Sequence, residues 1–211
     1  GMEIQTMNDR VFGARQLALQ LLFSDHVGDC RPPCQLACPA RGDVKGYVNY
    51  AAEGEFRASL EALHENITLP ASIGRICPAP CEEKCRRNFV DEEPVSIREI
   101  KRFIGDWGIK TGDLGTIPEI KENGKKVAIV GGGPAGLSAA YYLRRMGYAI
   151  TLFDKESALG GMMRFGIPDY RLPQPVLQKE IDWIIDHGIE TRLGTTLGKD
   201  VTLDELRKDY D

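Results

Sequence analysis

The chain has 211 residues, a formal net charge of −4 and 42% hydrophobic residues. This length allows two modest domains with separate cores, and the acidic balance argues against nucleic acid as the main partner. No apolar run of about 18 residues occurs, so a transmembrane helix is not expected. The first residues lack the basic start and apolar core of a secretory signal. We therefore expect a cytoplasmic protein whose cysteines are free thiols or metal ligands rather than disulfides.

The first half predicts a helical domain. Apolar residues recur at helical spacing over residues 11–22, 56–63 and 97–107. Ser96, followed by Glu99, predicts a capping box for the last of these helices. No alternating strand pattern appears in this half, which we interpret as an all-α domain.

A linker separates this part from a second domain. Residues 111–118 combine glycine, proline, threonine and aspartate, as loops do. We expect a helical domain at residues 1–110, a linker at 111–125 and a second domain at 126–211.

The second domain predicts the start of a doubly wound α/β fold. The expected strands are 127–130 and 149–153, and the expected helices are 135–146 and about 175–187, the latter ended by Gly188. Thr202 and Glu205 predict a capping box for one more helix. One βαβ unit with few elements behind it makes a small sheet, so we expect the sequence to stop inside an incomplete Rossmann-type domain.

A glycine loop follows the first expected strand. Gly131, Gly133 and Gly136 occupy the glycine positions of G-x-G-x-x-G, which allow a tight turn, close approach of backbone to a pyrophosphate, and helix–strand packing. The helix behind the loop offers free N–H groups and a positive dipole end to phosphates. Asp154 lies 18 residues after Gly136, where an acid can bond the adenosine ribose. This context favours a nucleotide site over an ordinary glycine-rich turn.

The loop alone does not choose between FAD and NAD. Gly160 and Gly161 follow the acidic strand end, and paired glycines leave room for a bulky ligand. This favours FAD, with an ordinary loop as the alternative. No second G-x-G-x-x-G follows, so NAD(P)H is expected to bind only in a domain outside this chain.

All six cysteines lie in two triplets ahead of the glycine loop. The triplets are Cys30, Cys34 and Cys38, followed by proline, and Cys77, Cys81 and Cys85. Clustered thiolates bind iron–sulfur centres or zinc. The C-x3-C-P end of the first triplet matches the tail of the bacterial ferredoxin run, whose last cysteine ligates the other cluster. Six cysteines therefore suit two clusters with three thiolates each.

Each cluster then needs a further ligand. His26 continues the spacing of four before the first triplet, and Asp25 and Asp29 are further candidates. Glu99 lies near the second triplet, although capping is its simpler role. Zinc is the main alternative, because its sites often contain a C-x2–4-C pair, and three disulfides are a weaker one.

At these residues the chain resembles the small subunit of NADPH-dependent glutamate synthase and the N-terminal half of dihydropyrimidine dehydrogenase. The matching stretches are residues 33–39, 74–82, 127–137 and 160–173, in the order of the family. The resemblance implies a helical domain with two [4Fe–4S] clusters, then FAD and NADPH domains. It also implies an electron-transfer subunit that works with a protein partner.

The resemblance further implies site residues. One cluster takes Cys30, Cys34 and Cys85, and the other takes Cys38, Cys77 and Cys81. The residues implied to line FAD are Gly131, Gly132, Gly133, Pro134, Ala135, Gly136, Asp154, Lys155, Gly160, Gly161, Met162 and Arg171. The chain departs from the family at two ligand positions: the first family cysteine falls near Val27, and an oxygen ligand, Glu or Gln, falls at Lys101.

These features predict a redox subunit in which NAD(P)H reduces FAD and the clusters carry single electrons to a partner. The chain alone is not expected to oxidise NAD(P)H. No hydrolytic constellation occurs, and His64 and His187 are expected at ordinary surface positions. The alternative is a non-enzymatic, metal-stabilised docking module with a vestigial nucleotide fold.

Overall fold

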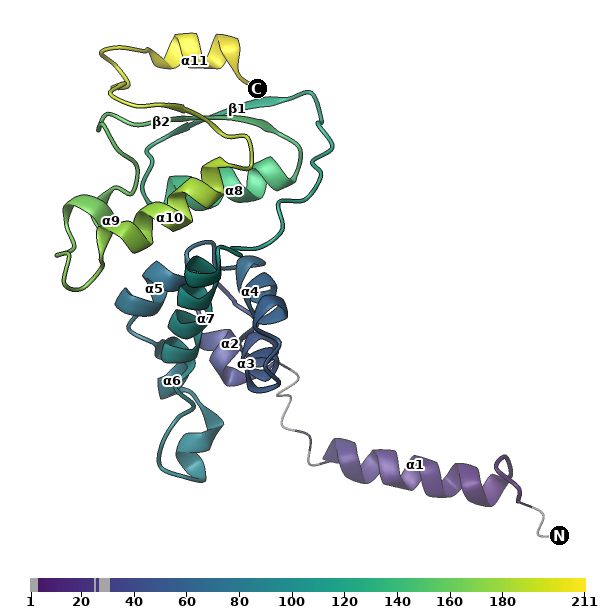
Figure 1. Cartoon of the computed structure of the whole chain (residues 1–211). Coiled ribbons are helices and arrows are strands. Elements are labelled where there is room, and N and C mark those ends of the chain that lie inside the picture. The colour runs from purple at the N-terminus through teal and green to yellow at the C-terminus, as the bar shows by residue number, and fades with distance from the viewer. Residues whose placement is uncertain (1–3, 25, 27–30) are drawn as a thin grey trace.

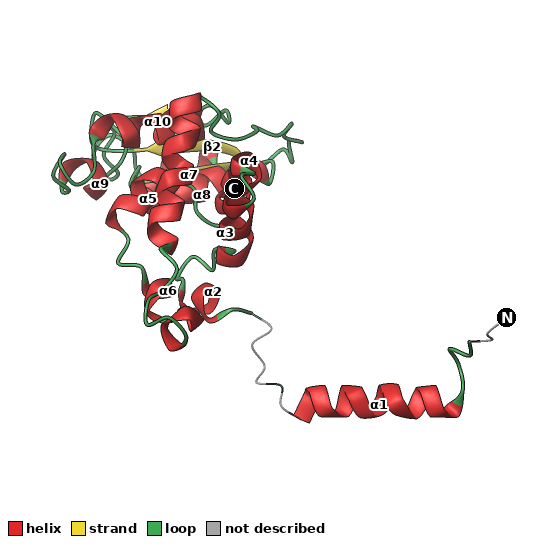
Figure 2. Cartoon of the chain, turned by 60° about the horizontal axis from the view of Figure 1, so that its bottom comes forward, coloured by secondary structure: helices red, strands yellow, loops and turns green. Residues whose placement is uncertain are grey.

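The computed structural model describes residues 4–24, 26 and 31–211. A projecting N-terminal helix, a bundle of short helices and an α/β layer follow one another along the chain (Figure 1). The first helix, α1 (Asp9–Ser24), forms where the periodicity predicts it but buries none of its residues. It stands apart from the bundle in both ribbon views (Figures 1 and 2).

The predicted helical half is a bundle of short helices. They are α2 (Pro33–Ala37), α3 (Val44–Ala52), α4 (Phe56–His64), α5 (Pro70–Ile76), α6 (Pro80–Glu83), the 3₁₀ helix η1 (Arg86–Phe89) and α7 (Ile97–Thr111). Three of them begin with proline, whose fixed φ and missing N–H suit the first helical turn. Their buried core includes Tyr47, Leu60, Leu63, Ile97 and Ile104.

Helices α5 and α7 cross at very close range because glycine lies at both contact points. A Cβ atom on Gly74 of α5 would lie 2.6 Å from the Cα of Arg102, and one on Gly105 of α7 would lie 2.4 Å from the backbone nitrogen of Ala71. The absence of both side chains allows the two backbones to touch. Substitution at either glycine would separate the helices.

The predicted capping box at Ser96 is wrong. The Ser96 side chain makes no cap hydrogen bond, and Glu99 instead pairs with Arg98 and Arg102 at 3.0 and 3.7 Å. The backbone N–H of Arg98 donates to the Glu82 carboxylate at 2.7 Å. A side chain from α6 therefore caps α7, which sequence-local reasoning does not anticipate.

The α/β part has a three-stranded parallel sheet in the order β1-β2-β3. Its elements are β1 (Lys126–Val130), α8 (Pro134–Arg145), β2 (Ala149–Phe153), α9 (Met162–Phe165), α10 (Gln174–Ile185), β3 (Glu190–Arg192) and α11 (Leu203–Asp209). Helices α8 and α10 lie between the sheet and the bundle, and α11 lies on the opposite side (Figure 1). The Thr202–Glu205 capping box is confirmed. A helical domain followed by a Rossmann-like region is the architecture that the sequence predicts.

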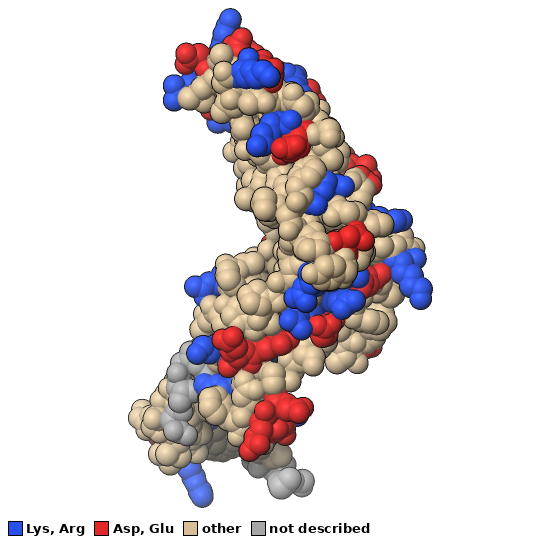
Figure 3. All heavy atoms as spheres, turned by 90° about the vertical axis from the view of Figure 1, so that its left-hand side faces the viewer, with Lys and Arg blue, Asp and Glu red and all other residues tan. Residues whose placement is uncertain are grey.

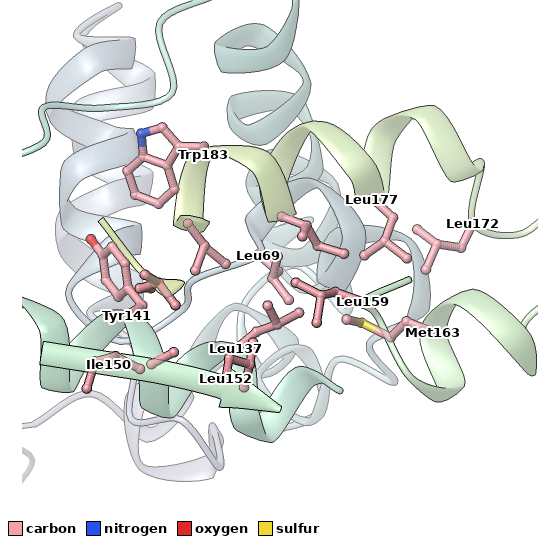
Figure 4. Packing of buried hydrophobic residues seen from close by; sticks show 14 residues of the cluster. Leu69, Leu137, Tyr141, Ile150, Leu152, Leu159, Met163, Leu172, Leu177 and Trp183 are labelled. Carbon is pink, nitrogen blue, oxygen red and sulfur yellow. The ribbon is translucent and has the colours of Figure 1, made fainter. Parts of the chain in front are cut away.

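One hydrophobic core joins the bundle to the α/β layer. Leu69, just before α5, packs with Leu137 of α8 and Leu177 of α10, and Figure 4 shows the three side chains converging. Ile73 and Ile76 of α5 pack against the same cluster. Helix α5 thus belongs to the cysteine-bearing bundle in sequence but packs partly in the α/β core.

His64 and His187 are buried, so their expected surface positions are wrong. They are 5% and 3% exposed. His64 stacks on Trp183 with ring centroids 4.3 Å apart, and His187 meets the same ring edge-on at 4.7 Å. Both histidines therefore serve packing between α4, α8 and α10. Within the described residues, no helix combines the length and apolar character needed to cross a membrane.

Candidate functional site

The described cysteines lie within or next to four short helical segments. Cys34 is inside α2 and Cys38 ends it, Cys77 ends α5, Cys81 is inside α6, and Cys85 precedes η1. Helices α2 and α6 pack against each other, and Figure 2 shows them side by side. The fold therefore brings Cys34 and Cys38 close to the second triplet, although about 40 residues separate the two segments along the chain.

The turn between Cys77 and Cys81 has an unusual backbone. Ala79 has φ 58° and ψ 51°, a left-handed conformation that non-glycine residues avoid. Its N–H donates to the Cys77 sulfur at 3.4 Å. Strained backbone of this kind persists where its surroundings enforce it, and here it fixes one thiol sulfur with a backbone donor.

Burial raises the pKa values of two described cysteines. For Cys34, the negative charges of Cys85 and Asp43 add to the effect of burial. Burial raises the pKa of Cys81 to about 11, and the charges of Cys77 and Cys38 add to it while that of Lys101 opposes it. Thiols of the two triplets therefore influence one another, and the assignment of three cysteines to each cluster stays a prediction.

Tyr47 of α3 is buried near cysteines of both triplets, and no sequence motif indicated this. It is 2% exposed and shares a hydrophobic cluster with Cys81, against which Cys34 also packs. Burial raises its pKa, and the charges of Cys81, Cys38, Cys34 and Cys77 raise it further. The Tyr47 ring therefore contributes to the core on which the cysteine-bearing segments pack.

The donor chemistry fits iron–sulfur ligation. The five described cysteines carry free thiols, they are partly or fully buried, and one sulfur already accepts a backbone N–H, a contact that tunes cluster potentials. In the part of the chain that the structure describes, no three His, Cys, Asp or Glu side chains form a site for a single metal ion.

The structure describes two of the candidates for additional cluster ligands, His26 and Glu99. His26 is exposed, with its ring 6.1 Å from that of Phe23, and its role as a ligand remains a prediction. Glu99 is engaged by two arginines on the surface of α7. Cys30, Asp25, Asp29 and Val27 lie outside the described residues.

The glycine loop leaves an open cradle at the start of α8. A Cβ on Gly136 would lie 1.8 Å from the carbonyl oxygen of Gly131, so only glycine fits where helix meets strand. At Gly133 the only atom within 4 Å of such a Cβ is the Gly161 Cα, at 3.8 Å. Pro134 and Ala135 are exposed at the first turn of the helix. Free backbone N–H groups at the N-terminus of a helix are the donors that phosphate groups bind.

The predicted glycine pair lies directly against this loop. The N–H of Gly160 donates to the carbonyl of Gly132 at 2.8 Å. Gly161 has φ +50°, and a Cβ on it would lie 2.8 Å from the Cα of Gly133. Met162, which follows, is 72% exposed at the start of α9. The two glycine segments thus form one surface.

Asp154 is held more tightly than the sequence suggested. Its carboxylate accepts the N–H of Gly132 at 2.6 Å and that of Glu156 at 2.8 Å. It is buried, while Lys155 beside it is exposed. The acid therefore fixes the glycine loop in addition to any contact it makes with a ribose.

Arg171 lies at the boundary with the helical bundle. It lines a cavity of about 210 Å³ together with Arg75 of α5 and with Arg98 and Arg102 of α7. On the face drawn in Figure 3, lysine, arginine and carboxylate side chains alternate, so that face carries no continuous basic field.

Comparisons with known proteins agree with both parts of this arrangement. Residues 25–113 match the family model for dihydropyrimidine dehydrogenase domain II, 4Fe–4S cluster, and residues 129–195 match that for an NAD(P)-binding Rossmann-like domain. The chain is 42% identical over 200 residues to the beta subunit of NADP(+)-dependent formate dehydrogenase from Moorella thermoacetica, which covers 85% of the chain and 28% of that protein.

Two further relatives carry the names that the resemblance implies. The NADPH glutamate synthase small chain of Mycobacterium tuberculosis is 36% identical over 184 residues, covering 87% of the chain and 38% of that protein. The PreT subunit of NAD-dependent dihydropyrimidine dehydrogenase from Salmonella typhimurium is 37% identical over 180 residues, covering 84% and 43%. The chain is a homologue of these oxidoreductase subunits. It spans between 28% and 43% of the length of these three relatives.

Proposed function

We propose that this chain transfers electrons between a flavin and two [4Fe–4S] clusters within an NAD(P)H-dependent oxidoreductase subunit. The proposal rests mainly on the position of helix α5, which contacts both the cysteine-bearing bundle and the α/β core. Cys77 ends this helix, while Ile73 and Ile76 pack into the core that holds the glycine-loop helix α8. One rigid element therefore connects a cluster ligand with the dinucleotide-binding part, as electron transfer over a fixed distance requires.

The chain's own residues would hold and shield the redox groups. Cys30, Cys34 and Cys85 would hold one cluster, and Cys38, Cys77 and Cys81 the other. A flavin accepts electron pairs and releases single electrons, and each cluster carries one electron at a time. The protein contributes burial, backbone donors to sulfur and a fixed geometry.

FAD is the proposed occupant of the glycine loop. Gly131–Gly136 would cradle the pyrophosphate, Asp154 and Lys155 would lie beside the ribose, and Gly160–Met162 would give the remaining ligand room. The contact between Gly133 and Gly161 supports this, because the paired glycines widen the surface next to the loop. Arg171 would extend the site toward the helical bundle, where the arginine-lined cavity lies.

Domain limits, partner and location complete the proposal. We assign residues 1–110 to the cluster domain, 111–125 to a linker and 126–211 to the flavin domain; apart from Thr111, the last residue of α7, the linker contains no helix or strand. The relatives are named as subunits or chains of larger enzymes, which supports a protein electron donor or acceptor. Free thiols at all five described cysteines support a reducing compartment such as the cytoplasm.

Anaerobic reconstitution of the full chain tests this function. Iron, sulfide and FAD are added and the excess is removed. Bound iron, acid-labile sulfide and flavin are then measured per chain. We expect two clusters and a bound flavin, with visible absorbance from both. Bound zinc in a colourless protein would instead support the docking-module alternative and contradict electron transfer.

A further inference from the structure

Lys101 is a buried lysine with no counter-ion among the described residues. It is 5% exposed and lies between Ile97 and Ile104 on the buried face of α7. No hydrogen bond or ion pair joins its ammonium group to any part of the chain that the structure describes. Among the described residues, the side-chain atoms that are fully buried without a partner do not include Lys101 Nζ, so the ammonium group keeps some contact with solvent. A nearly enclosed, unpaired lysine charge is placed to act on a negative group bound beside it.

Lys101 lies on the side of α7 that meets Cys81. It shares the buried face of α7 with Ile97 and Ile104, and Cys81 packs in the same hydrophobic cluster as these two residues. The hydrogen bond from the α7 backbone to Glu82 ties α6, which carries Cys81, to α7. A negative group held by Cys81 would therefore lie on the same side of α7 as the lysine.

Lys101 is also the only buried lysine or arginine among the residues that the structure describes. Among the described residues, no other lysine or arginine is buried, so no buried cationic side chain accompanies the second thiol pair, Cys34 and Cys85. The two cysteine groups consequently differ in whether a buried cationic side chain accompanies them.

We propose that Lys101 is the counter-charge, not a ligand, of the cluster held by Cys38, Cys77 and Cys81, and that it raises the reduction potential of that cluster alone. This inference rests on the proposed function. One-electron reduction adds one negative charge to a cluster and neither forms nor breaks a bond to the protein. A fixed positive charge in a poorly solvated site favours the more negative, reduced form.

Redox titration of the reconstituted full chain tests the proposal. Dithionite supplies the electrons, and electron paramagnetic resonance follows each cluster. Lys101→Met should shift the reduction equilibrium of one cluster about tenfold toward the oxidised form, about 59 mV for a one-electron couple, without loss of iron. Lys101→Arg should keep the original equilibrium. Lys110→Met removes a lysine from the exposed end of the same helix and should change neither cluster.

A stability measurement gives a second readout. In the cluster-free chain, Lys101→Met should raise the melting temperature, because a buried charge is removed. In the cluster-loaded chain, the same substitution should raise the melting temperature by a smaller amount. If Lys101→Met does not fold, Lys101→Leu takes its place, because leucine removes the charge without offering a ligand. An unchanged potential, equal shifts of both clusters, or loss of about half the iron, as expected for a ligand, would each overturn the inference. Failure of the unaltered chain to bind iron and sulfide would instead contradict the proposed function itself.

Discussion

Glu180 of α10 accepts a hydrogen bond from the backbone N–H of Ala71 in the first turn of α5, at 2.7 Å. Its second carboxylate oxygen accepts the N–H of Ser72 at 2.9 Å. These are orphan donors of a helix N-terminus, so a side chain of the α/β part caps a helix of the cysteine bundle. The Gly74 and Gly105 contacts then lock that helix against α7. The connection between the two parts therefore depends on a carboxylate that is 1% exposed.

Glu180→Gln should change how stability depends on pH. Burial raises the pKa of Glu180 to about 7, against the opposing effects of Ser72, Ala71 and Arg75. Because the folded pKa is above the ordinary value of 4.5, this group's contribution to stability is present below pH 4.5 and is lost as pH rises through about 7. The free energy of unfolding of the natural chain relative to Glu180→Gln should fall by about 3 kcal/mol across this window.

The difference between the two proteins is the quantity to measure, by chemical denaturation at several pH values. His64, whose pKa burial lowers to about 3, acts in the opposite direction: its contribution weakens stability as pH falls below 6.5. Glu205→Gln is a suitable control, because that exposed carboxylate has a pKa lowered by its bonds to Thr202. A constant difference between the natural chain and Glu180→Gln from pH 4 to 8 would contradict the assignment.

Serine substitutions should sort the cysteines into two groups. Serine offers a harder and poorer ligand than a thiolate, so Cys81→Ser should remove one cluster, with roughly half of the iron and sulfide, and leave the other. The spectrum of the cluster that remains in Cys38→Ser should match that of the cluster that remains in Cys81→Ser. Cys34→Ser and Cys85→Ser should share the complementary spectrum, because the proposed ligand sets place both cysteines on the other cluster. A remaining spectrum of Cys38→Ser that matched that of Cys34→Ser would show the grouping to be wrong.

His26→Ala tests the first candidate for a non-cysteine ligand. His26 stands ahead of the first triplet and is exposed. If its imidazole completes the cluster of Cys34 and Cys85, the variant should lose iron from that cluster faster in air and shift its reduction potential. His187→Ala is not a suitable control, because that ring is buried. The surface substitution Lys110→Met is the appropriate control. Unchanged spectra and potentials would remove His26 as a ligand.

The sequence predicted the regular parts of this molecule well. The strands at 127–130 and 149–153 and the helix between them match β1, β2 and α8 within one residue at each end, because period, glycine loop and caps all agree locally. The proximity of the two cysteine triplets was predicted through a family resemblance, and the packing of α2 on α6 agrees with it.

What the sequence missed depends on contacts between distant segments. Glu82 caps α7 in place of Ser96, Glu180 caps α5 across 109 positions, and no local pattern encodes either pairing. His64 and His187 were expected at the surface because polar residues usually lie there. Their burial follows from the aromatic stack with Trp183, which forms only when α4, α8 and α10 meet.

Two alanine substitutions in the glycine loop should separate folding from ligand binding. At Gly136 the new Cβ would lie 1.8 Å from the Gly131 carbonyl oxygen, so Gly136→Ala should displace α8 from β1 and lower the melting temperature. At Gly133 the nearest atom to the new Cβ is 3.8 Å away and φ is −75°. Gly133→Ala should therefore keep the fold and the melting temperature.

The same Gly133→Ala chain should nevertheless bind FAD at least tenfold more weakly, about 1.4 kcal/mol, because the methyl group occupies the cradle that a pyrophosphate needs. Fluorescence titration with FAD measures this, and titration with NADP(H) tells which dinucleotide the loop prefers. Gly124→Ala, in a turn outside the loop where nothing lies within 4 Å of the new Cβ, controls for a general effect of replacing glycine, although its φ of +79° will reduce stability slightly. Full FAD affinity in Gly133→Ala would mean that the phosphates do not lie in this loop.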